Sequence, residues 1–502
     1  MYHGYPVFGL PAPAETDPLT ELEILSRTQG DNTGGEILNR TVHHAAETLS
    51  TPVIQRTHPL RFVRHIQEGL AGCITFYGEQ RTEALSLYAA QLELFVKRAM
   101  AAHQTGCRPE YELAITELTF VQEWLLSNQD VTPGGELKHA AATLVEYCDH
   151  LARRIPLLDT SCQIGAGPIA ELYLQHYDRE LELESELEKA REFRQSIHKR
   201  LLQECGLFHQ RFQAEMKVEA IPFTLRELAG DAPRPEEIPA VLMRQVTRLL
   251  QYQIDLELAP ATSPPRDSSY LEFVSHAFDI PHSLGPGEDG QTRLRLSPAA
   301  PRNGHQFPRQ HSFSRLEIEA VRITLHQNLV ACFPSPLLSE LLPRENRRGL
   351  ELFWLHTLQR AGWGKGDIRL RIISDLTLLQ EVVTFIALLE YHALGEDEHL
   401  ILAGLTQDNC FNREEALTVV ATIKLDPLAL GWGYPVFREL KRLDRYYRRK
   451  LGSGITRADF NRVLFTGALL PVGSLSRYLS RQFSQMLAVA GETTPDKAPQ
   501  HD

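Results

Sequence analysis

The sequence has few of the features that mark several large classes of protein. No Cys-x-x-Cys pair occurs, and no histidine is followed directly by glutamate, so the zinc-binding pattern His-Glu-x-x-His is absent. No stretch approaches the roughly 18 uncharged apolar residues that a membrane span needs. Basic residues are outnumbered, with 52 Lys and Arg against 64 Asp and Glu, which gives a net charge of −12. Because nucleic-acid binding needs clustered positive charge, we expect neither a nucleic acid nor a membrane as a partner.

Cysteines are sparse and widely scattered. Their number is odd, and they are Cys73, Cys107, Cys148, Cys162, Cys205, Cys332 and Cys410. This distribution favours reduced thiols in a reducing compartment. The first 18 residues contain no basic segment followed by an apolar run, so no secretory signal is expected. Together these observations predict a cytoplasmic protein.

The chain has enough apolar material for a large core, since 43% of its 502 residues are apolar and 23% are charged. Apolar residues recur at helical spacings along most of the chain, which predicts an all-α fold with little β structure. Prolines crowd residues 219 to 312, where we expect irregular structure and one short strand around Leu294 and Leu296. The expected parts are a loosely ordered segment 1–55, a helical part 56–218, an irregular segment 219–315, a second helical part 316–485 and a disordered tail 486–502.

The stretch Leu316–Gln327 is expected to form a buried helix. Ile318, Val321 and Leu325 follow one another at i, i+3 and i+7, so they share one helical face. The acid Glu319 lies in the same stretch, next to Ile318. The chemistry of the stretch therefore depends on which side chains contact Glu319.

Several landmarks in the C-terminal third occur in a characteristic order. They are Asn412–Ala416, Asp426-Pro427, Arg438–Leu443, Ala458–Leu464 and Gly467–Pro471. In this order they resemble the ending of a large bacterial family of helical, zinc-peptidase-like proteins known as domain of unknown function 885. Upstream, Gly167–Leu187 and Tyr270–Pro281 resemble the family in the same order. The resemblance implies a large gluzincin-like helical domain around a central cleft.

The resemblance also identifies Leu316–Gln327 as the former metal helix. The family motif has the form His-Glu-Ala-x-Pro-Gly-His-His, and its first histidine falls on Ile318 while its acid is kept as Glu319. The second pair of histidines falls on Thr324 and Leu325, and the carboxylate ligand of a later helix falls on Leu352. Ile, Thr and Leu cannot hold zinc, and zinc is what makes bound water acidic enough to attack an amide. The resemblance thus implies a metal-free, peptidase-inactive protein without a cofactor.

Glu319 has two possible roles at this stage. It can form a salt bridge with Arg322 at i+3 on the same helix. Alternatively, it is an acid poised for metal-free acid/base chemistry. The candidate catalytic residues in the second case are Glu319, His326, His356, His392 and Tyr434. For the histidines, a hydrogen-bonded place in the core is the alternative, and a metal site rebuilt from His326, His356 and Glu351 is a third possibility.

Two further patterns admit both a structural and a functional interpretation. The segment 438–450 carries seven basic residues and predicts a strongly basic helix in an acidic protein. It is either a solvated face or a docking surface for an acidic protein partner or an anionic ligand. His276 and His282 have the histidine spacing of the family motif but no acid, so they represent a chance spacing or a relocated metal site.

Two functions remain open from the sequence. The first is a non-catalytic homologue that binds a peptide, a small molecule or a protein partner, with the central cleft as the ligand site. The second is a repurposed metal-free enzyme that acts on an amino-acid-like or peptide-like metabolite, with Glu319 as the acid/base. A metallohydrolase with relocated ligands is a third and weaker possibility.

Overall fold

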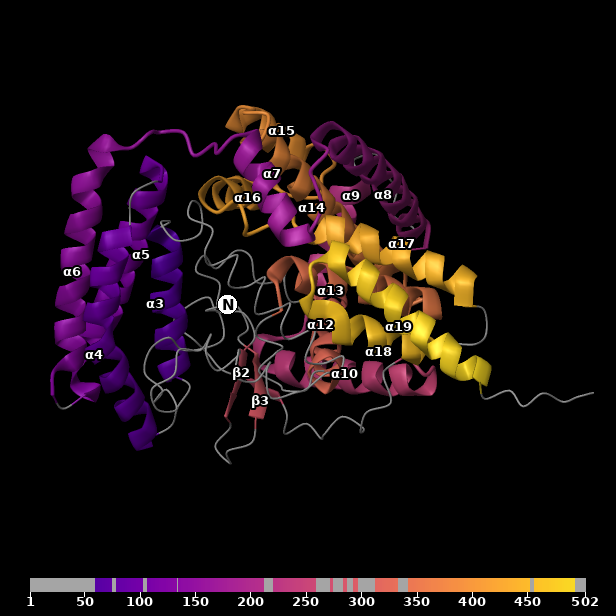
Figure 1. The fold of residues 1–502 in the computed structure, drawn as a ribbon, viewed down its shortest axis with the longest axis horizontal. Coiled ribbons are helices and arrows are strands. Elements are labelled where there is room, and N and C mark those ends of the chain that lie inside the picture. Colours follow the sequence, from indigo (N-terminus) through magenta and orange to yellow (C-terminus); the bar gives the residue numbers. More distant parts are fainter. Residues whose placement is uncertain are drawn as a thin grey trace, which may run out of the picture. The chain divides into compact units, whose positions relative to one another are not determined.

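The computed structural model describes residues 59–74, 78–102, 106–132, 134–211, 220–258, 271–273, 283–286, 292–296, 312–332, 342–451 and 456–492. In these residues the fold is all-α with three short strands, as the helical periodicity predicts (Figure 1). The chain divides into two compact units. Unit 1 comprises residues 1–164, 266–307 and 424–427, and unit 2 comprises the remainder.

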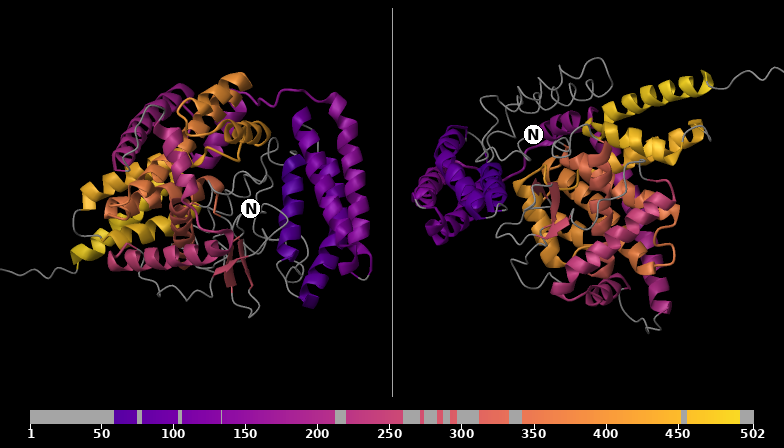
Figure 2. Two further views of the ribbon diagram at one scale, coloured as in Figure 1. Left: turned by 180° about the vertical axis from the view of Figure 1, so that it is seen from behind. Right: turned by 90° about the horizontal axis from the view of Figure 1, so that it is seen from below.

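The described residues of unit 1 form four long helices. They are α3 (Pro59–Ile74), α4 (Gly78–Ala102), α5 (Arg108–Ser127) and α6 (Glu136–Arg154), with the short 3₁₀ turns η1 (Gln129–Val131) and η2 (Ile155–Leu157). The four helices lie side by side in both Figure 1 and Figure 2. On α6, Leu137, Leu144 and Leu151 recur every seven residues and are all fully buried. This heptad spacing keeps one apolar stripe against the neighbouring helices.

In the described part of unit 1 there are also three strands: β1 (Leu271–Phe273), β2 (Ser283–Pro286) and β3 (Thr292–Leu296). Their order is β1-β3-β2, and β3 runs parallel to β1 and antiparallel to β2. Leu294 of β3 pairs with Leu271 on one side and Leu284 on the other. The short strand predicted around Leu294 is therefore confirmed.

A disulfide joins Cys107 and Cys162 in unit 1. Cys107 immediately precedes α5, and Arg108 N–H donates to the Asp159 carbonyl at 2.8 Å, so the backbone already brings the two segments together. The expectation of reduced thiols is wrong for this pair. The two cysteines are 55 residues apart in the sequence, so their proximity could not be inferred from it. The other five cysteines are free thiols, as expected.

The other helices in the described ranges belong to unit 2. They are α7 (Ala166–Tyr177), α8 (Leu183–Arg211), α9 (Ala220–Gly230), α10 (Ile238–Asp255), α12 (Phe313–Cys332), α13 (Arg344–Ala361), α14 (Ile368–His392), α15 (Glu398–Thr406), α16 (Arg413–Leu425), α17 (Gly433–Leu451), α18 (Arg457–Thr466) and α19 (Val472–Glu492), with the 3₁₀ turns η3 (Pro235–Glu237) and η6 (Gly467–Leu469). The core of the unit forms around α14, which packs most extensively against α8.

Helix α14 is mostly apolar and is buried along most of its length. Among the described residues it alone is long and apolar enough to cross a membrane by length and composition, and 94% of its most apolar window is buried inside the protein. Burial on all sides is what a central helix of a helical domain requires. Asp367 caps its first turn by accepting hydrogen bonds from the Arg369 and Leu370 N–H groups.

Two glycines allow α13 and α17 to approach closely. A Cβ at Gly349 on α13 would lie 2.4 Å from the Val436 side chain on α17. A Cβ at Gly433, the first residue of α17, would lie 2.4 Å from Arg348 Cγ and 2.8 Å from a carboxylate oxygen of Glu381. The absence of these side chains brings α13, α14 and the start of α17 together around charged groups.

Two boundary predictions need correction. Residues 219–315 are not irregular throughout, since α9 and α10 lie within them. Pro222 and Pro239 occupy the first turns of these helices, where a missing N–H costs nothing. The tail does not begin at 486, because α19 continues to Glu492. Segment 1–55 and both His276 and His282 lie outside the described residues.

Candidate functional site

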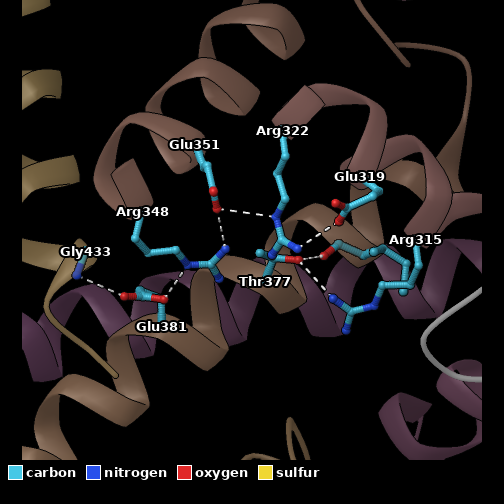
Figure 3. A network of polar contacts seen from close by, with 9 residues as sticks. Arg315, Glu319, Arg322, Arg348, Glu351, Thr377, Glu381 and Gly433 are labelled. Atoms are coloured by element: carbon cyan, nitrogen blue, oxygen red, sulfur yellow. Dashed lines mark hydrogen bonds and ion pairs between the residues drawn. The ribbon is translucent and has the colours of Figure 1, made fainter. Parts of the chain in front are cut away.

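A chain of alternating acids and arginines runs across α12, α13 and α14 in unit 2 (Figure 3). Arg322 on α12 donates from Nη1 to Glu319 Oε2 at 2.9 Å. Its Nε lies 3.3 Å from Glu351 Oε2 on α13, an ion pair that lacks hydrogen-bond geometry. The Arg322 guanidinium thus lies between two carboxylates from different helices.

The chain continues from Glu351 to α14 and α17. Arg348 donates from Nη1 to Glu351 Oε2 at 2.9 Å and from Nε to Glu381 Oε2 at 2.8 Å. The other oxygen of Glu381 accepts the backbone N–H of Gly433 at 3.0 Å. We call Glu319, Arg322, Glu351, Arg348 and Glu381 the Arg–Glu chain.

Helical spacing places these side chains. Glu319 and Arg322 are three residues apart on α12, and Arg348 and Glu351 are three residues apart on α13, so each pair shares a helical face. Beside the chain, Arg315 of α12 donates to Thr377 Oγ1 at 3.3 Å and to Gln380 Oε1 at 3.4 Å, both on α14 (Figure 3). Two guanidinium groups from α12 and one from α13 therefore lie in or beside the Arg–Glu chain.

The Arg–Glu chain is only partly withdrawn from solvent. The side-chain exposure is 34% for Arg322, 20% for Glu319 and 18% for Glu351, but only 9% for Glu381. Burial lowers the pKa of the Arg348 guanidinium, but the charges and hydrogen bonds of Glu381 and Glu351 outweigh burial and raise it above its ordinary value. Arg348 is therefore a permanent cation, and solvent-accessible atoms remain along the chain for a ligand to contact.

The salt-bridge interpretation of Glu319 is confirmed. The apolar face of α12 is buried as expected, with Ile318 5% exposed and Val321 and Leu325 each 1% exposed. Thr324 is fully buried and accepts a hydrogen bond from Gln253 Nε2 at 3.1 Å. The positions that would carry zinc ligands in the resembling family therefore lie in the packed interior.

The two histidines nearest in sequence occupy different surroundings. His326 is partly buried on α12, seven residues or about 10 Å along the helix axis from Glu319. His356 on α13 packs edge-on against Phe437, with ring centroids 6.1 Å apart. Burial, followed by the positive charges of Lys441 and nearby arginines, lowers the pKa of His356 to about 3. His356 is therefore a neutral imidazole near pH 7.

His392 and Tyr434 have structural partners elsewhere. His392 forms a hydrogen bond between Nε2 and the Ile423 carbonyl at 2.9 Å and lies eleven residues, or about 16 Å of helix, beyond Glu381. The Tyr434 hydroxyl donates to the Lys189 carbonyl of α8 at 3.3 Å, and burial raises its pKa to about 12. Backbone carbonyls of α16 and α8 therefore hold His392 and Tyr434 in place.

Sequence reasoning missed a buried His–Glu pair. His176 at the end of α7 has Nδ1 2.6 Å from Glu345 Oε1 in the first turn of α13. Its other nitrogen, Nε2, is buried and has no hydrogen-bond partner in the described part of the chain. Glu345 lies one turn before Arg348, so this pair adjoins the Arg–Glu chain. The residues are 169 positions apart, and no local motif could have linked them.

The site does not fit a zinc ion. Within the described ranges, no group of three or more His, Cys, Asp or Glu side chains is placed to hold a metal. Glu319 and Glu351 already share the Arg322 cation. Zinc needs about three protein ligands, and the neighbouring Ile318 and Leu352 supply none.

No family model matches this chain, and no curated protein matches it. Solved structures share its fold. The "putative lipoprotein of unknown function" from Shewanella oneidensis aligns with a TM-score of 0.70 at 12% identity, over 93% of this chain and 91% of that one. The "putative lipoprotein" from Colwellia psychrerythraea aligns with a TM-score of 0.66 at 12% identity, over 93% and 90% of the two chains. At this identity the likeness establishes the fold alone.

Proposed function

We propose that this protein is a metal-free, peptidase-inactive binding protein related to the helical zinc-peptidase-like family of domain of unknown function 885. The observation that carries the proposal is the Arg322 guanidinium between Glu319 and Glu351. In this view an arginine takes the place of the metal cation between two carboxylates. The substitution preserves a positive charge at the site and removes the hydrolytic chemistry.

The chemistry of the Arg–Glu chain supports binding rather than hydrolysis. A guanidinium stays charged and offers only donors, so it cannot supply a hydroxide. One carboxylate oxygen of Glu319 already accepts a hydrogen bond from Arg322. Partly exposed arginines beside carboxylates suit a ligand that carries both an amine and a carboxylate. We therefore propose an amino-acid-like or peptide-like ligand.

The test measures binding and metal content in the same preparations. Calorimetric titration with free dipeptides, and with the same dipeptides blocked at either end, should show binding that needs the free carboxylate. Arg322→Met should weaken it at least tenfold, because a charge-assisted hydrogen bond contributes about 1.5–3 kcal/mol. Arg462→Met is the matched control, since Arg462 forms an i,i+3 pair with Asp459 on α18.

Elemental analysis supplies the opposing outcome. Zinc at about one ion per chain, or a dipeptide affinity equal in Arg322→Met and the wild type, would remove the basis of the proposal.

A metal-free enzyme is the second candidate function. The observation that favours it is the His176–Glu345 pair, because a carboxylate on Nδ1 leaves Nε2 as a proton acceptor. Glu319 is the weaker candidate base because Arg322 engages it. Turnover of a dipeptide or amino-acid amide that is lost in His176→Gln but kept in Glu319→Gln would favour this candidate over simple binding.

We also propose that the chain works in an oxidising compartment. The Cys107–Cys162 disulfide supports this, since such bonds persist mainly outside reducing compartments. Both neighbours in fold are named as lipoproteins, which agrees with the proposal. It departs from the cytoplasmic location that the scattered cysteines favour. Thiol alkylation of protein taken directly from its native cells should leave Cys107 and Cys162 unlabelled, and labelling of both would restore the cytoplasmic interpretation.

A further inference from the structure

The exposed face of α17 carries a shallow hollow lined by arginines. Its lining residues are Arg442, Arg445, Tyr446 and Arg449, and its volume is about 480 Å³. Because these residues are spaced at i, i+3, i+4 and i+7, they share one side of the helix. The opposite side of α17 is buried, with Leu440, Leu443 and Tyr447 each at most 3% exposed. We call the exposed feature the basic hollow.

Carboxylates near the basic hollow are already shared among several arginines. Glu439 binds both Arg179 and Arg442, at 2.7 and 2.6 Å. Asp444 is within ion-pair distance of Arg360, Arg448 and Arg457. Two acids therefore serve five guanidinium groups, and positive charge is left in excess.

Two arginines of the basic hollow have no carboxylate partner in the described part of unit 2. Arg445 donates from Nε only to the Lys441 carbonyl at 3.3 Å, and Arg449 has no ion pair. The excess charge acts on its surroundings, since burial and then Arg445 lower the pKa of Lys441. An anion bound at the hollow would relieve this repulsion.

We propose that the basic hollow binds a phosphate group, either of a phosphomonoester lipid headgroup or of a free phosphorylated metabolite. A tetrahedral phosphate accepts hydrogen bonds from several guanidinium groups at once, which matches three arginines around one space. An acidic protein fits less well. A stable protein interface needs about 1,000 Å² and an apolar centre, whereas here Tyr446 stands alone among arginines.

The first test uses inorganic phosphate as the probe at a fixed ionic strength set with sodium chloride. Calorimetric titration of the full chain should show saturable phosphate binding. The variant Arg445→Gln/Arg449→Gln should bind phosphate at least tenfold more weakly. The control Arg226→Gln/Arg413→Gln removes the same charge from two exposed arginines on other helices and should bind as the wild type does. Equal far-ultraviolet circular dichroism verifies that all variants fold.

A second set of measurements separates the sources of the phosphate. Phosphatidylcholine vesicles containing phosphatidic acid carry phosphomonoesters, and vesicles with phosphatidylglycerol at equal surface charge carry phosphodiesters. Binding to phosphatidic acid that depends on Arg445 and Arg449 identifies a lipid headgroup, and binding of free phosphate alone identifies a soluble ligand. Equal binding to both vesicle types, or equal phosphate affinity in all three proteins, overturns the proposal. Binding of a polyglutamate peptide without phosphate binding also overturns it, in favour of an acidic protein partner.

Discussion

The close approach of α13 and α17 predicts that alanine at Gly349 destabilises unit 2. Gly349 lies within α13, where alanine is the better helix former by about 1 kcal/mol. Packing at this position has the opposite effect, because it destabilises the alanine variant. The new Cβ would lie 2.4 Å from Val436 Cβ and Cγ1 and 3.0 Å from the Gly433 carbonyl oxygen. The outcome therefore reveals which of the two effects is larger.

Packing should prevail because the obstructing groups cannot move aside. Val436 is 1% exposed, and a β-branched side chain has one strongly preferred rotamer in a helix. The third contact is a backbone oxygen at the start of α17. Overpacking of this kind costs about 1–3 kcal/mol, so after the gain in helix propensity of about 1 kcal/mol we expect a net loss of up to about 2 kcal/mol. The shift should also displace Gly433 from Glu381 and weaken ligand binding at the Arg–Glu chain.

Urea unfolding followed by tryptophan fluorescence is the assay. Trp354, Trp363 and Trp432 belong to unit 2, so the signal reports mainly on that unit. Gly206→Ala is the matched control, because it lies within α8 and its Cβ would meet nothing within 4 Å. The control should raise the unfolding midpoint. Gly349→Ala should lower it, and Gly349→Ala/Val436→Ala should recover the part due to the clash. A Gly349→Ala protein as stable as the control would refute the reasoning.

Three other predictions concern the disulfide and two of the expected site residues. The bond between Cys107 and Cys162 closes a separation of 55 residues, so Cys162→Ser should destabilise unit 1 by about 4 kcal/mol in urea, an effect that a reductant reproduces in the wild type. His356 has a folded pKa of about 3, below the unfolded value, so the unfolded state binds more protons and stability falls as pH drops below about 6.5. His356→Gln should flatten that pH dependence, and an unchanged profile would contradict the assignment. Tyr434→Phe should leave dipeptide affinity unchanged, because its hydroxyl is bonded to the Lys189 carbonyl rather than to the Arg–Glu chain.

The fold was largely predictable because helical periodicity survives in single segments. The pattern from Ile368 to Leu394 matches α14, and the pattern from Val436 to Leu451 matches most of α17. Prolines misled the prediction at α9 and α10, since proline in a first turn starts a helix rather than breaking it. The disulfide was not predicted from the sequence, because Cys107 and Cys162 come together only through the packing of α5 and α6.

The candidate site was predictable only where it is local. The Glu319–Arg322 pair follows from helical spacing, and the structure confirms it. The ion pair of Arg322 with Glu351 joins residues on two helices, so no spacing rule could give it. Glu381 accepts a hydrogen bond from the Gly433 N–H, which is 52 residues away. Every residue except proline has such a backbone donor, so the sequence does not indicate which one is used. The sequence therefore indicated one acid, and folding supplied its partners.

The arginines between the acids determine the charge pattern of the candidate site. Arg322 lies between Glu319 and Glu351, and Arg348 lies between Glu351 and Glu381, so a cation separates each pair of like charges. Arg315 beside the chain supplies a third cation, so three guanidinium groups accompany three acids. The proposed ligand would therefore contact both signs of charge, with its amine near the carboxylates and its carboxylate near the guanidinium groups.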